Sequence, residues 1–329
     1  MKKVAINGVG RIGRAALKIL SDIDELQVVA VNDIAPVESI AYLLQYDSVH
    51  GRFEKQVSHQ DGHLLIDGEQ IQYFSERDPA QLPWKDLEID VVIESTGRFT
   101  ETDQANKHIT AGAKTVVLSG PTKSPDIPTV VHGVNSDDGH THIFSCASCT
   151  TNNISPVIEI LGRRLGIKKA ILNTIHADTT SNAVVDKPNT KNPRMGRSGL
   201  NNLIPTTTGA AVATTKAMPE YTGRFDGIAI RVPVAVGSLS DITMVTERPT
   251  TVEEINQILT EEAATDRYKG VFDVTNDPIV STDIIKSPLA SLADLGMTKV
   301  VDGDLVKVLS WYDNEWGFTN QMIRQFLEM

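Results

Sequence analysis

The sequence predicts an α/β protein: a Rossmann-type, doubly wound parallel sheet domain followed by an α+β catalytic domain with a mostly antiparallel sheet. Two observations lead to this fold class. In the first half, short continuous apolar runs alternate with helical patterns, as in strands that are buried on both faces of a parallel sheet. In the second half, the predicted strands are longer and several alternate apolar with polar residues, which is typical of an antiparallel sheet with one solvated face.

The first half supplies strand–helix–strand units. A short apolar strand is predicted at residues 4–7, followed by a helix whose apolar residues repeat at helical spacing over 14–20. Further apolar strands are predicted at 26–32, 91–95 and 115–119. This order forms the βαβ unit of a doubly wound sheet.

The second half begins with a predicted helix, whose apolar face extends from Ile154 to Leu165. Strands are predicted at 170–175, 225–232, 238–245 and 305–311, and a capping box at 251–254 opens another helix. The polar stretch from Thr179 to Leu203 has no clear period, and a loop of this length is usually functional or interfacial. We therefore expect two domains, divided near Ser148, and a final helix that could pack on either one.

Composition narrows the function. The chain has 329 residues and a formal net charge of −11, so nucleic acid and anionic membranes would repel it. The apolar stretch at the start is too short for a signal peptide, and nothing approaches the roughly 20 apolar residues of a membrane span. Two cysteines in so long a chain do not make a secreted disulfide framework. These observations predict a soluble, cytoplasmic protein with reduced cysteines and the size of an enzyme.

A G-x-G-x-x-G motif, formed by Gly8, Gly10 and Gly13, follows the first predicted strand and opens the first helix. The glycines allow a tight turn, close approach of a pyrophosphate, and close packing of helix on strand. The amides around Arg11 and Ile12 would then face the phosphates. Asp33 ends the second strand, where an acid binds the adenosine ribose and repels a 2′-phosphate, which predicts NAD rather than NADP.

A cysteine and a histidine are candidates for covalent catalysis. Cys149 lies at or near the start of the predicted helix, where the helix dipole lowers the pKa of a thiol and favours the nucleophilic thiolate. His176 follows a β-branched strand and enters a Thr-rich turn. A histidine there is more often structural than catalytic, although a cysteine and a histidine far apart in sequence can pair in the fold.

Cys146 and Cys149 form a C-x-x-C pair that has other interpretations. The chain has no second cysteine pair or suitably spaced histidine pair to complete a zinc site, so we predict no metal. A redox role for the pair, including a disulfide, stays open as a minor modulation.

Ten segments together resemble the phosphorylating glyceraldehyde-3-phosphate dehydrogenase family over essentially the whole chain. They are INGVGRIGR at 6–14, ND at 32–33, YDSVHG at 46–51, ERDP at 76–79, STG at 95–97, ASCTTN at 147–152, TIHA at 174–177, IPTTTGAA at 204–211, RVP at 231–233 and WYDNEWG at 311–317. The ASCTTN block is highly specific.

The resemblance implies an enzyme that oxidises glyceraldehyde 3-phosphate with NAD and inorganic phosphate. Cys149 would be the nucleophile and His176 its base. It also implies a homotetramer, in which the long polar loop would reach a neighbouring subunit's cofactor, and an NAD-binding domain at 1–148 completed by a C-terminal helix at 315–329, with a catalytic domain at 149–314. The implied cofactor residues are Arg11, Ile12, Asp33, Arg77, Thr96, Ser119 and Asn314. The implied residues for substrate phosphate and inorganic phosphate are Ser148, Thr150, Thr179, Thr208, Gly209 and Arg231.

The chain departs from the family pattern at several positions. Asp178 replaces a usual aromatic residue, Met195 stands where an arginine commonly helps to bind phosphate, and Asn153 and Cys146 also differ. These departures concern substrate preference more than reaction type. Two alternatives therefore stay open: a related dehydrogenase acting on another sugar phosphate, such as erythrose 4-phosphate, and a redox-sensing binding paralogue.

Overall fold

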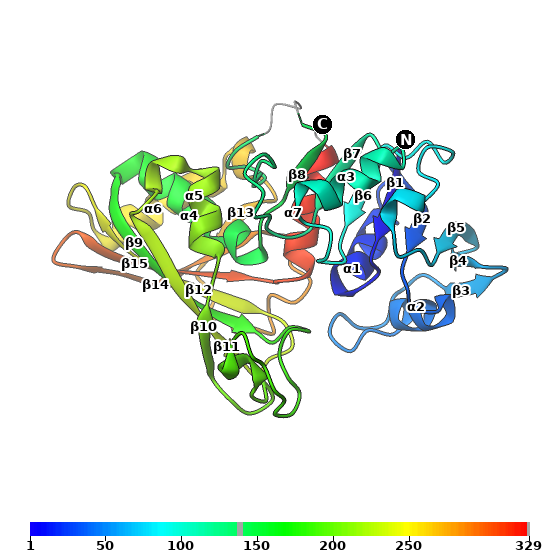
Figure 1. The fold of residues 1–329 in the computed structure, drawn as a ribbon. Coiled ribbons are helices and arrows are strands. Elements are labelled where there is room, and N and C mark those ends of the chain that lie inside the picture. The colour runs from blue at the N-terminus through cyan, green and yellow to red at the C-terminus, as the bar shows by residue number, and fades with distance from the viewer. Residues whose placement is uncertain (137–140, 328–329) are drawn as a thin grey trace. The chain divides into compact units, whose positions relative to one another are not determined.

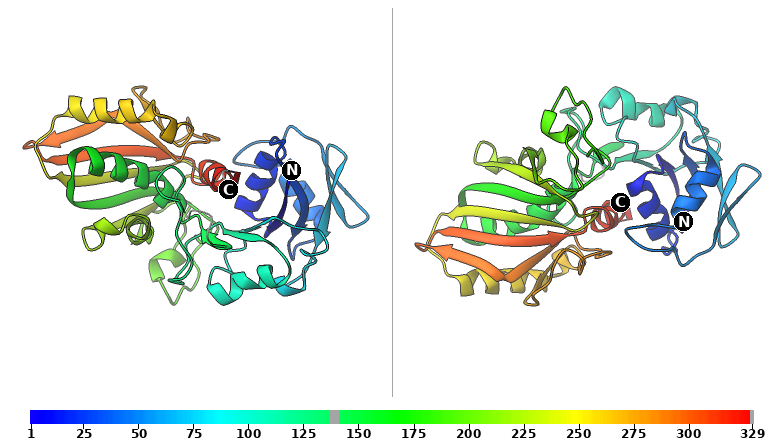
Figure 2. Two further views of the ribbon diagram at one scale, coloured as in Figure 1. Left: turned by 90° about the horizontal axis from the view of Figure 1, so that it is seen from above. Right: turned by 90° about the horizontal axis from the view of Figure 1, so that it is seen from below.

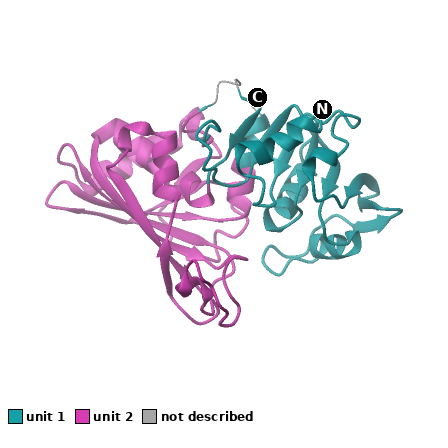
Figure 3. Ribbon diagram, in the orientation of Figure 1, with its two compact units in different colours: residues 1–130, 136–147, 322–329 teal, residues 131–135, 148–321 magenta. Residues whose placement is uncertain are grey.

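The computed structural model describes residues 1–136 and 141–327 (Figure 1). The chain divides into two compact units, each with its own sheet (Figure 3). Unit 1 comprises residues 1–130, 136–147 and 322–329, and unit 2 comprises residues 131–135 and 148–321. None of the described helices is long and apolar enough to cross a membrane.

Unit 1 is built on an eight-stranded sheet with the order β3-β4-β5-β2-β1-β6-β7-β8. Its parallel part confirms the Rossmann-type prediction, because β1 pairs with β2 on one side and with β6 on the other, both in parallel. The strands of this part are β1 (Lys2–Asn7), β2 (Leu26–Asn32), β6 (Val91–Glu94), β7 (Thr115–Leu118) and β8 (Ile143–Ser145). The direction of winding changes between β1 and β6, so a ligand crevice is expected at their carboxyl ends.

The rest of unit 1 comprises helices and an antiparallel meander that the sequence did not reveal. β5 pairs with β2 in parallel, whereas β3 pairs with β4, and β4 with β5, in antiparallel. These elements are α1 (Arg11–Leu20), α2 (Val37–Gln45), β3 (Val57–Gln60), β4 (His63–Ile66), β5 (Glu69–Phe74), η1 (Pro79–Gln81) and α3 (Thr102–Thr110).

Unit 2 contains a seven-stranded sheet with the order β10-β11-β9-β12-β15-β14-β13. It is mostly antiparallel, as predicted, but β9 pairs with β11 and β13 with β14 in parallel. The strands are β9 (Ile167–Ala177), β10 (Ile204–Thr207), β11 (Phe225–Val232), β12 (Ser238–Thr246), β13 (Phe272–Thr275), β14 (Ser291–Val301) and β15 (Leu305–Tyr312).

Helices α4 (Cys149–Leu165), α5 (Ala210–Ala217) and α6 (Val252–Ala263) pack against this sheet (Figure 2). The capping box predicted for α6 is present, since the Thr251 hydroxyl accepts the Glu254 amide at 3.2 Å. Short 3-10 turns η2 (Pro193–Gly196), η3 (Pro219–Tyr221) and η4 (Asp266–Tyr268) lie in the connections. Helix α7 (Trp316–Leu327) begins in unit 2 and ends in unit 1, and the last two residues of the predicted C-terminal helix lie outside the described residues.

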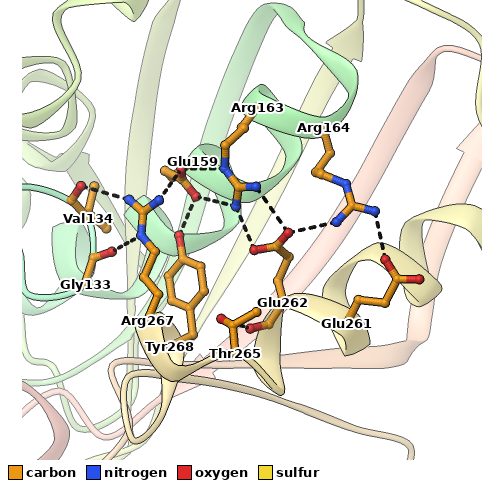
Figure 4. Close-up of polar contacts among 10 residues, drawn as sticks. All are labelled: Gly133, Val134, Glu159, Arg163, Arg164, Glu261, Glu262, Thr265, Arg267 and Tyr268. Carbon is orange, nitrogen blue, oxygen red and sulfur yellow. Dashed lines mark hydrogen bonds and ion pairs between the residues drawn. The ribbon is translucent and has the colours of Figure 1, made fainter.

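An ion-pair network joins α4 to α6 and η4 within unit 2 (Figure 4). The Glu262 side chain is 8% exposed and accepts hydrogen bonds from Arg163 at 2.7 Å and from Arg164 at 2.8 Å. Arg267 donates to Glu159 at 2.9 Å and also to the carbonyls of Gly133 and Val134. The network therefore holds the C-terminal end of α4, the helix that begins at Cys149.

We expect Glu262→Gln to lower the free energy of unfolding by about 1–3 kcal/mol, because it removes charge-assisted hydrogen bonds at a buried carboxylate. Hydrogen bonds from Arg163, and then from Arg164, lower the pKa of Glu262. This stabilisation is present above the ordinary glutamate pKa and is lost as pH falls through the lowered pKa of the folded state.

Urea unfolding at neutral and at acidic pH measures this effect. Glu261→Gln is the matched control, because the Glu261 side chain is 46% exposed and pairs with Arg164 at the surface. Equal losses in the two variants, or a loss for Glu262→Gln that persists in acid, would contradict the assignment.

Candidate active site

The glycine loop of unit 1 joins β1 to α1 in the conformation that its residue types allow. Gly8 has φ of +94°, and a Cβ there would lie 2.7 Å from the Thr96 amide nitrogen. A Cβ on Gly13 would lie 2.1 Å from the Gly8 carbonyl oxygen, so only glycine lets α1 approach β1 this closely. A Cβ on Gly10 would meet nothing within 4 Å, which leaves its backbone open to a ligand.

A pocket opens at the carboxyl ends of β1, β2 and β6, all within unit 1. Five of the predicted cofactor residues line it, namely Gly8, Gly10, Asp33, Arg77 and Thr96. The other lining residues are Asn7, Asn32, Ile34, Glu76, Ser95, Arg98 and Phe99. The glycine cradle and a carboxylate at the end of β2 fit the pyrophosphate and ribose of a dinucleotide.

The remaining predicted cofactor residues of unit 1 do not line this pocket. Arg11 begins α1, and its guanidinium donates to Asp47 at 2.9 Å. Ile12 and Gly13 continue the first turn of α1. Ser119 directly follows β7, and its amide donates to the Glu94 carbonyl at 3.0 Å.

Asp33 is held by backbone amides on both sides. Its Oδ2 accepts the Val9 amide of the glycine loop at 2.7 Å, and its Oδ1 accepts the Ala35 amide at 2.9 Å. These bonds fix the carboxylate beside the loop, and each oxygen keeps a lone pair for a ribose hydroxyl.

Cys149, His176 and Arg231 converge in unit 2 from α4, β9 and β11. Ser148 caps α4, because its hydroxyl accepts the Thr151 amide at 3.1 Å, and Cys149 is therefore the first residue of the helix. The Cys149 Sγ lies 3.5 Å from Nε2 of His176. Residues Arg231 and His176 are register partners in the parallel pairing of β11 with β9, which explains why their side chains meet.

The contacts of the His176 ring define which nitrogen carries the proton. Nδ1 lies 2.7 Å from the Ala177 carbonyl, which can only accept, and 2.5 Å from the Arg231 guanidinium, which can only donate. Both cannot be hydrogen bonds to one nitrogen. We assign the proton to Nδ1, because the guanidinium also donates to the Ala177 carbonyl at 3.0 Å and so needs no bond to the ring. Nε2 then presents a lone pair to the Cys149 thiol.

Burial and Arg231 determine the charge state of this pair. Burial, and then the nearby Arg231 cation, lower the pKa of His176 to about 4, so the ring is a neutral base at neutral pH. Burial raises the pKa of the Cys149 thiol, and the charge of Arg231 opposes this only partly. The sequence-based expectation of a lowered thiol pKa is therefore wrong in its net direction, because local sequence does not reveal how dry the site is.

Two side chains near the end of β15, those of Tyr312 and Asn314, form hydrogen bonds around Cys149 and His176. The Tyr312 hydroxyl lies 2.9 Å from the hydroxyls of both Thr150 and Thr174, and its ring packs edge-on against His176. Asn314 accepts the Ser238 hydroxyl at 3.0 Å, and Ser238 in turn accepts the Ala177 amide. Sequence reasoning assigned no role to Tyr312, because its partners lie far away in the chain.

The other predicted phosphate-binding residues make local hydrogen bonds. The Thr179 hydroxyl pairs with Ser181 at 2.8 Å, and the Thr208 hydroxyl accepts the Ala210 amide at 3.1 Å. Gly209 caps α5, and a Cβ there would meet nothing within 4 Å. Arg231 is different, since its Nε is buried and has no hydrogen-bond partner among the described residues.

The departures from the family pattern have different surroundings. Asn153 is buried and donates to Ser310 at 2.9 Å and to the Trp311 carbonyl, which ties α4 to β15. Burial raises the pKa of Asp178, whose Oδ1 has no partner among the described residues. Met195 lies half-buried in η2. Cys146 is 3% exposed, and burial raises the pKa of its thiol.

Each of the two units contains a segment that matches a known protein family. Residues 2–102 match the family model of the glyceraldehyde 3-phosphate dehydrogenase NAD binding domain, and residues 148–314 match that of its C-terminal domain. The chain is 46% identical over 328 residues to glyceraldehyde-3-phosphate dehydrogenase of Thermotoga maritima, covering 98% of this chain and 97% of that protein. It is 43% identical over 325 residues to the enzyme of the same name from Streptomyces coelicolor, covering 98% and 96%.

The fold and the matched NAD-binding domain define an NAD-dependent oxidoreductase. The chain belongs to the glyceraldehyde-3-phosphate dehydrogenase family. Its cofactor is NAD, as the sequence predicted.

We expect Asp33→Asn and Asp33→Ala to narrow the preference for NAD over NADP, because each removes the charge that repels a 2′-phosphate. Loss of a charge-assisted hydrogen bond to ribose should weaken NAD binding by about 10- to 100-fold. Asp33→Asn keeps an oxygen that can accept the Val9 amide of the glycine loop. This variant therefore tests the loss of the charge without the loss of that hydrogen bond. The measurement is kcat/KM with NAD and with NADP, for the wild type and for each variant. Equal kcat/KM values with both cofactors in the wild type would refute the prediction.

Proposed function

We propose that the protein oxidises glyceraldehyde 3-phosphate to 1,3-bisphosphoglycerate with NAD and inorganic phosphate, as in glycolysis and gluconeogenesis. The observation that carries this proposal is the Cys149–His176 pair, 3.5 Å apart, with the guanidinium of Arg231 beside it. A thiol, a neutral base and an anion-binding cation are what acyl transfer to phosphate requires. Nucleotide binding is assigned to residues 1–148 and 315–329, and the chemistry to residues 149–314.

The reaction begins as the Cys149 sulfur attacks the aldehyde carbon. Nε2 of His176 takes the thiol proton and returns it to the former carbonyl oxygen, which gives a hemithioacetal on Cys149. His176 then removes that hydroxyl proton as the carbon is oxidised to a thioester. When bound, NAD supplies the hydride acceptor for this oxidation, and Asn314 would hold its carboxamide.

Inorganic phosphate then attacks the thioester carbon. The carbon–sulfur bond breaks, the acyl phosphate leaves, and the thiolate of Cys149 recovers a proton. The amides at the N-terminus of α4 and the His176 ring can stabilise the oxyanions along this path. Arg231 suits the phosphate groups, because its buried Nε has no other partner among the described residues. Ser148, Thr150, Thr179, Thr208 and Gly209 are proposed to complete the phosphate sites.

A panel of aldehydes tested with and without phosphate examines this function through the absorbance of NADH. We expect NADH formation to depend on phosphate and to be fastest with glyceraldehyde 3-phosphate. A higher kcat/KM for erythrose 4-phosphate would instead support the alternative sugar phosphate. The absence of NADH with every aldehyde would support a redox-sensing binding protein.

We also propose a homotetramer. Large apolar side chains are exposed on the 179–203 loop, including Val185 at 71% and Leu203 at 72%, and on the sheet, including Ile171 at 59%. Val184, Val185, Leu200 and Leu203 are all exposed within this one loop, and patches of exposed apolar side chains are typical of protein interfaces. We also propose a cytoplasmic location, because neither Cys146 nor Cys149 forms a disulfide.

Light scattering after size-exclusion chromatography should give the mass of four chains. Ile171→Lys and Leu203→Lys should lower that mass, since each would place a charge in an apolar interface. Val280→Lys is the control, because Val280 is similarly exposed, at 58%, but lies outside the loop and the sheet. A monomeric wild-type protein, or equal masses for all three variants, would refute the assignment.

A further inference from the structure

A buried chain of polar side chains lies behind the dinucleotide pocket, and the reaction itself does not use it. Trp84 and His108 are 0% exposed, and Glu94 and Asn7 are each 1% exposed. The indole nitrogen of Trp84 lies 3.0 Å from Nδ1 of His108, and Nε2 of His108 lies 3.0 Å from Oε2 of Glu94. All these residues belong to unit 1.

The direction of these bonds determines the protonation of His108. The Trp84 indole N–H can only donate, so Nδ1 of His108 accepts and carries no hydrogen. Nε2 must therefore carry the proton and donate it to Glu94. The 3.4 Å contact between Nε2 and the Asn7 amide nitrogen is then an approach of two donors to the same carboxylate oxygen. His108 is thus held as one neutral tautomer.

The two carboxylate oxygens of Glu94 accept hydrogen bonds from two different parts of the pocket. Oε1 accepts the amide N–H of Thr96 at 2.8 Å and also its hydroxyl. The Thr96 backbone lies directly against Gly8, where no Cβ would fit. Oε2 accepts Nδ2 of Asn7 at 2.6 Å in addition to the bond from His108. The carboxylate therefore holds the glycine loop through Thr96.

The chain continues along the other wall of the pocket. Asn7 accepts Nδ2 of Asn32 at 2.7 Å through its Oδ1. Asn32 in turn donates to the Glu76 carbonyl at 2.9 Å and accepts the Glu76 amide at 2.8 Å. Asn7, Asn32, Glu76 and Thr96 all line the pocket.

We propose that His108 is a positioning residue for NAD, which acts through Glu94 to set the geometry of the pocket. The Trp84 N–H keeps His108 in the tautomer that donates to Glu94. The hydrogen bond from His108 fixes the orientation of the Glu94 carboxylate. The oriented carboxylate in turn fixes Thr96 and Asn7, which both donate to it. His108 is fully buried and does not line the pocket, so we expect its substitution to change the affinity for NAD rather than the rate of the chemical step.

Two variants of His108 test this proposal. His108→Leu removes the donor to Glu94, and we expect NAD to bind about tenfold more weakly by isothermal titration calorimetry. His108→Gln keeps an N–H donor and should recover most of that affinity. For His108→Leu we expect the KM for NAD to rise while kcat at saturating NAD stays within about threefold of wild type. Because calorimetry needs no aldehyde, its result does not depend on the proposed substrate.

A purely structural role gives a different pattern. If His108→Leu lowers the melting temperature but leaves the NAD affinity of the folded protein unchanged, the proposal is overturned. The same conclusion follows if His108→Gln binds NAD as weakly as His108→Leu.

A second pair of variants serves if His108→Leu does not fold. Trp84→Phe removes the indole donor, and we expect weaker NAD binding as the tautomer is no longer fixed. Trp311→Phe is the matched control, because the Trp311 indole donates to the Asp294 carboxylate in unit 2 at 3.2 Å. Unchanged NAD affinity in Trp84→Phe, or an equal change in both variants, would contradict the proposal.

Discussion

Cys149→Ser should lower kcat/KM for the aldehyde by at least about a thousandfold, the scale seen when a covalent nucleophile is removed. A serine hydroxyl is far less acidic than a thiol, and a His176 whose pKa is about 4 is too weak a base to activate it. Phosphate-dependent formation of NADH is the measurement. Binding of NAD by calorimetry should be largely retained, because Cys149 does not line the pocket that the glycine loop and Asp33 form.

Cys146→Ser is the matched control and should retain activity within about threefold. The Cys146 thiol is only 3% exposed, whereas Cys149 is partly exposed and has the His176 base 3.5 Å from its sulfur. Alkylation by iodoacetamide followed by peptide mass spectrometry should therefore label Cys149 first. Labelling of Cys146 first, with activity intact, would reverse the assignment and favour the redox alternative.

His176→Asn should lower kcat by about 10²–10⁴-fold, the usual contribution of a general base. The pH profile of the wild type provides a sharper test. The lowered pKa of about 4 keeps His176 neutral at lower pH, so the base is lost only as pH falls through that value. We therefore expect kcat/KM to be free of a histidine-like acid limb between about pH 5.5 and 8, whereas an ordinary histidine would titrate near 6.5.

Arg231→Gln separates the two causes of this pKa shift. Removing the cation should let the pKa of His176 rise and move the acid limb to higher pH, while Arg231→Lys keeps the charge and most of the shift. Both variants should also raise the KM for phosphate, since Lys lacks the bidentate geometry of Arg. An acid limb near pH 6.5 in the wild type would show that His176 is not the buried neutral base.

Local patterns in the sequence determined much of the fold. Continuous apolar runs gave β1, β2, β6 and β7 as parallel strands, because burial on both faces leaves no polar alternation. The antiparallel meander from β3 to β5 and the parallel pairing of β9 with β11 were missed. Short strands with mixed residues carry little periodicity, and the direction of pairing depends on which segments meet in space.

In the candidate site, too, local sequence determined some features and contacts between distant segments determined others. By itself, the sequence determined the groups that depend on neighbours along the chain: the glycine turn after β1, Asp33 at the end of β2 and Cys149 at the start of α4. Only the tertiary structure decided that Arg231 reaches His176, because this contact depends on the register of β11 against β9. Only it could reveal that burial raises the pKa of the Cys149 thiol, since solvation depends on every element packed around the sulfur.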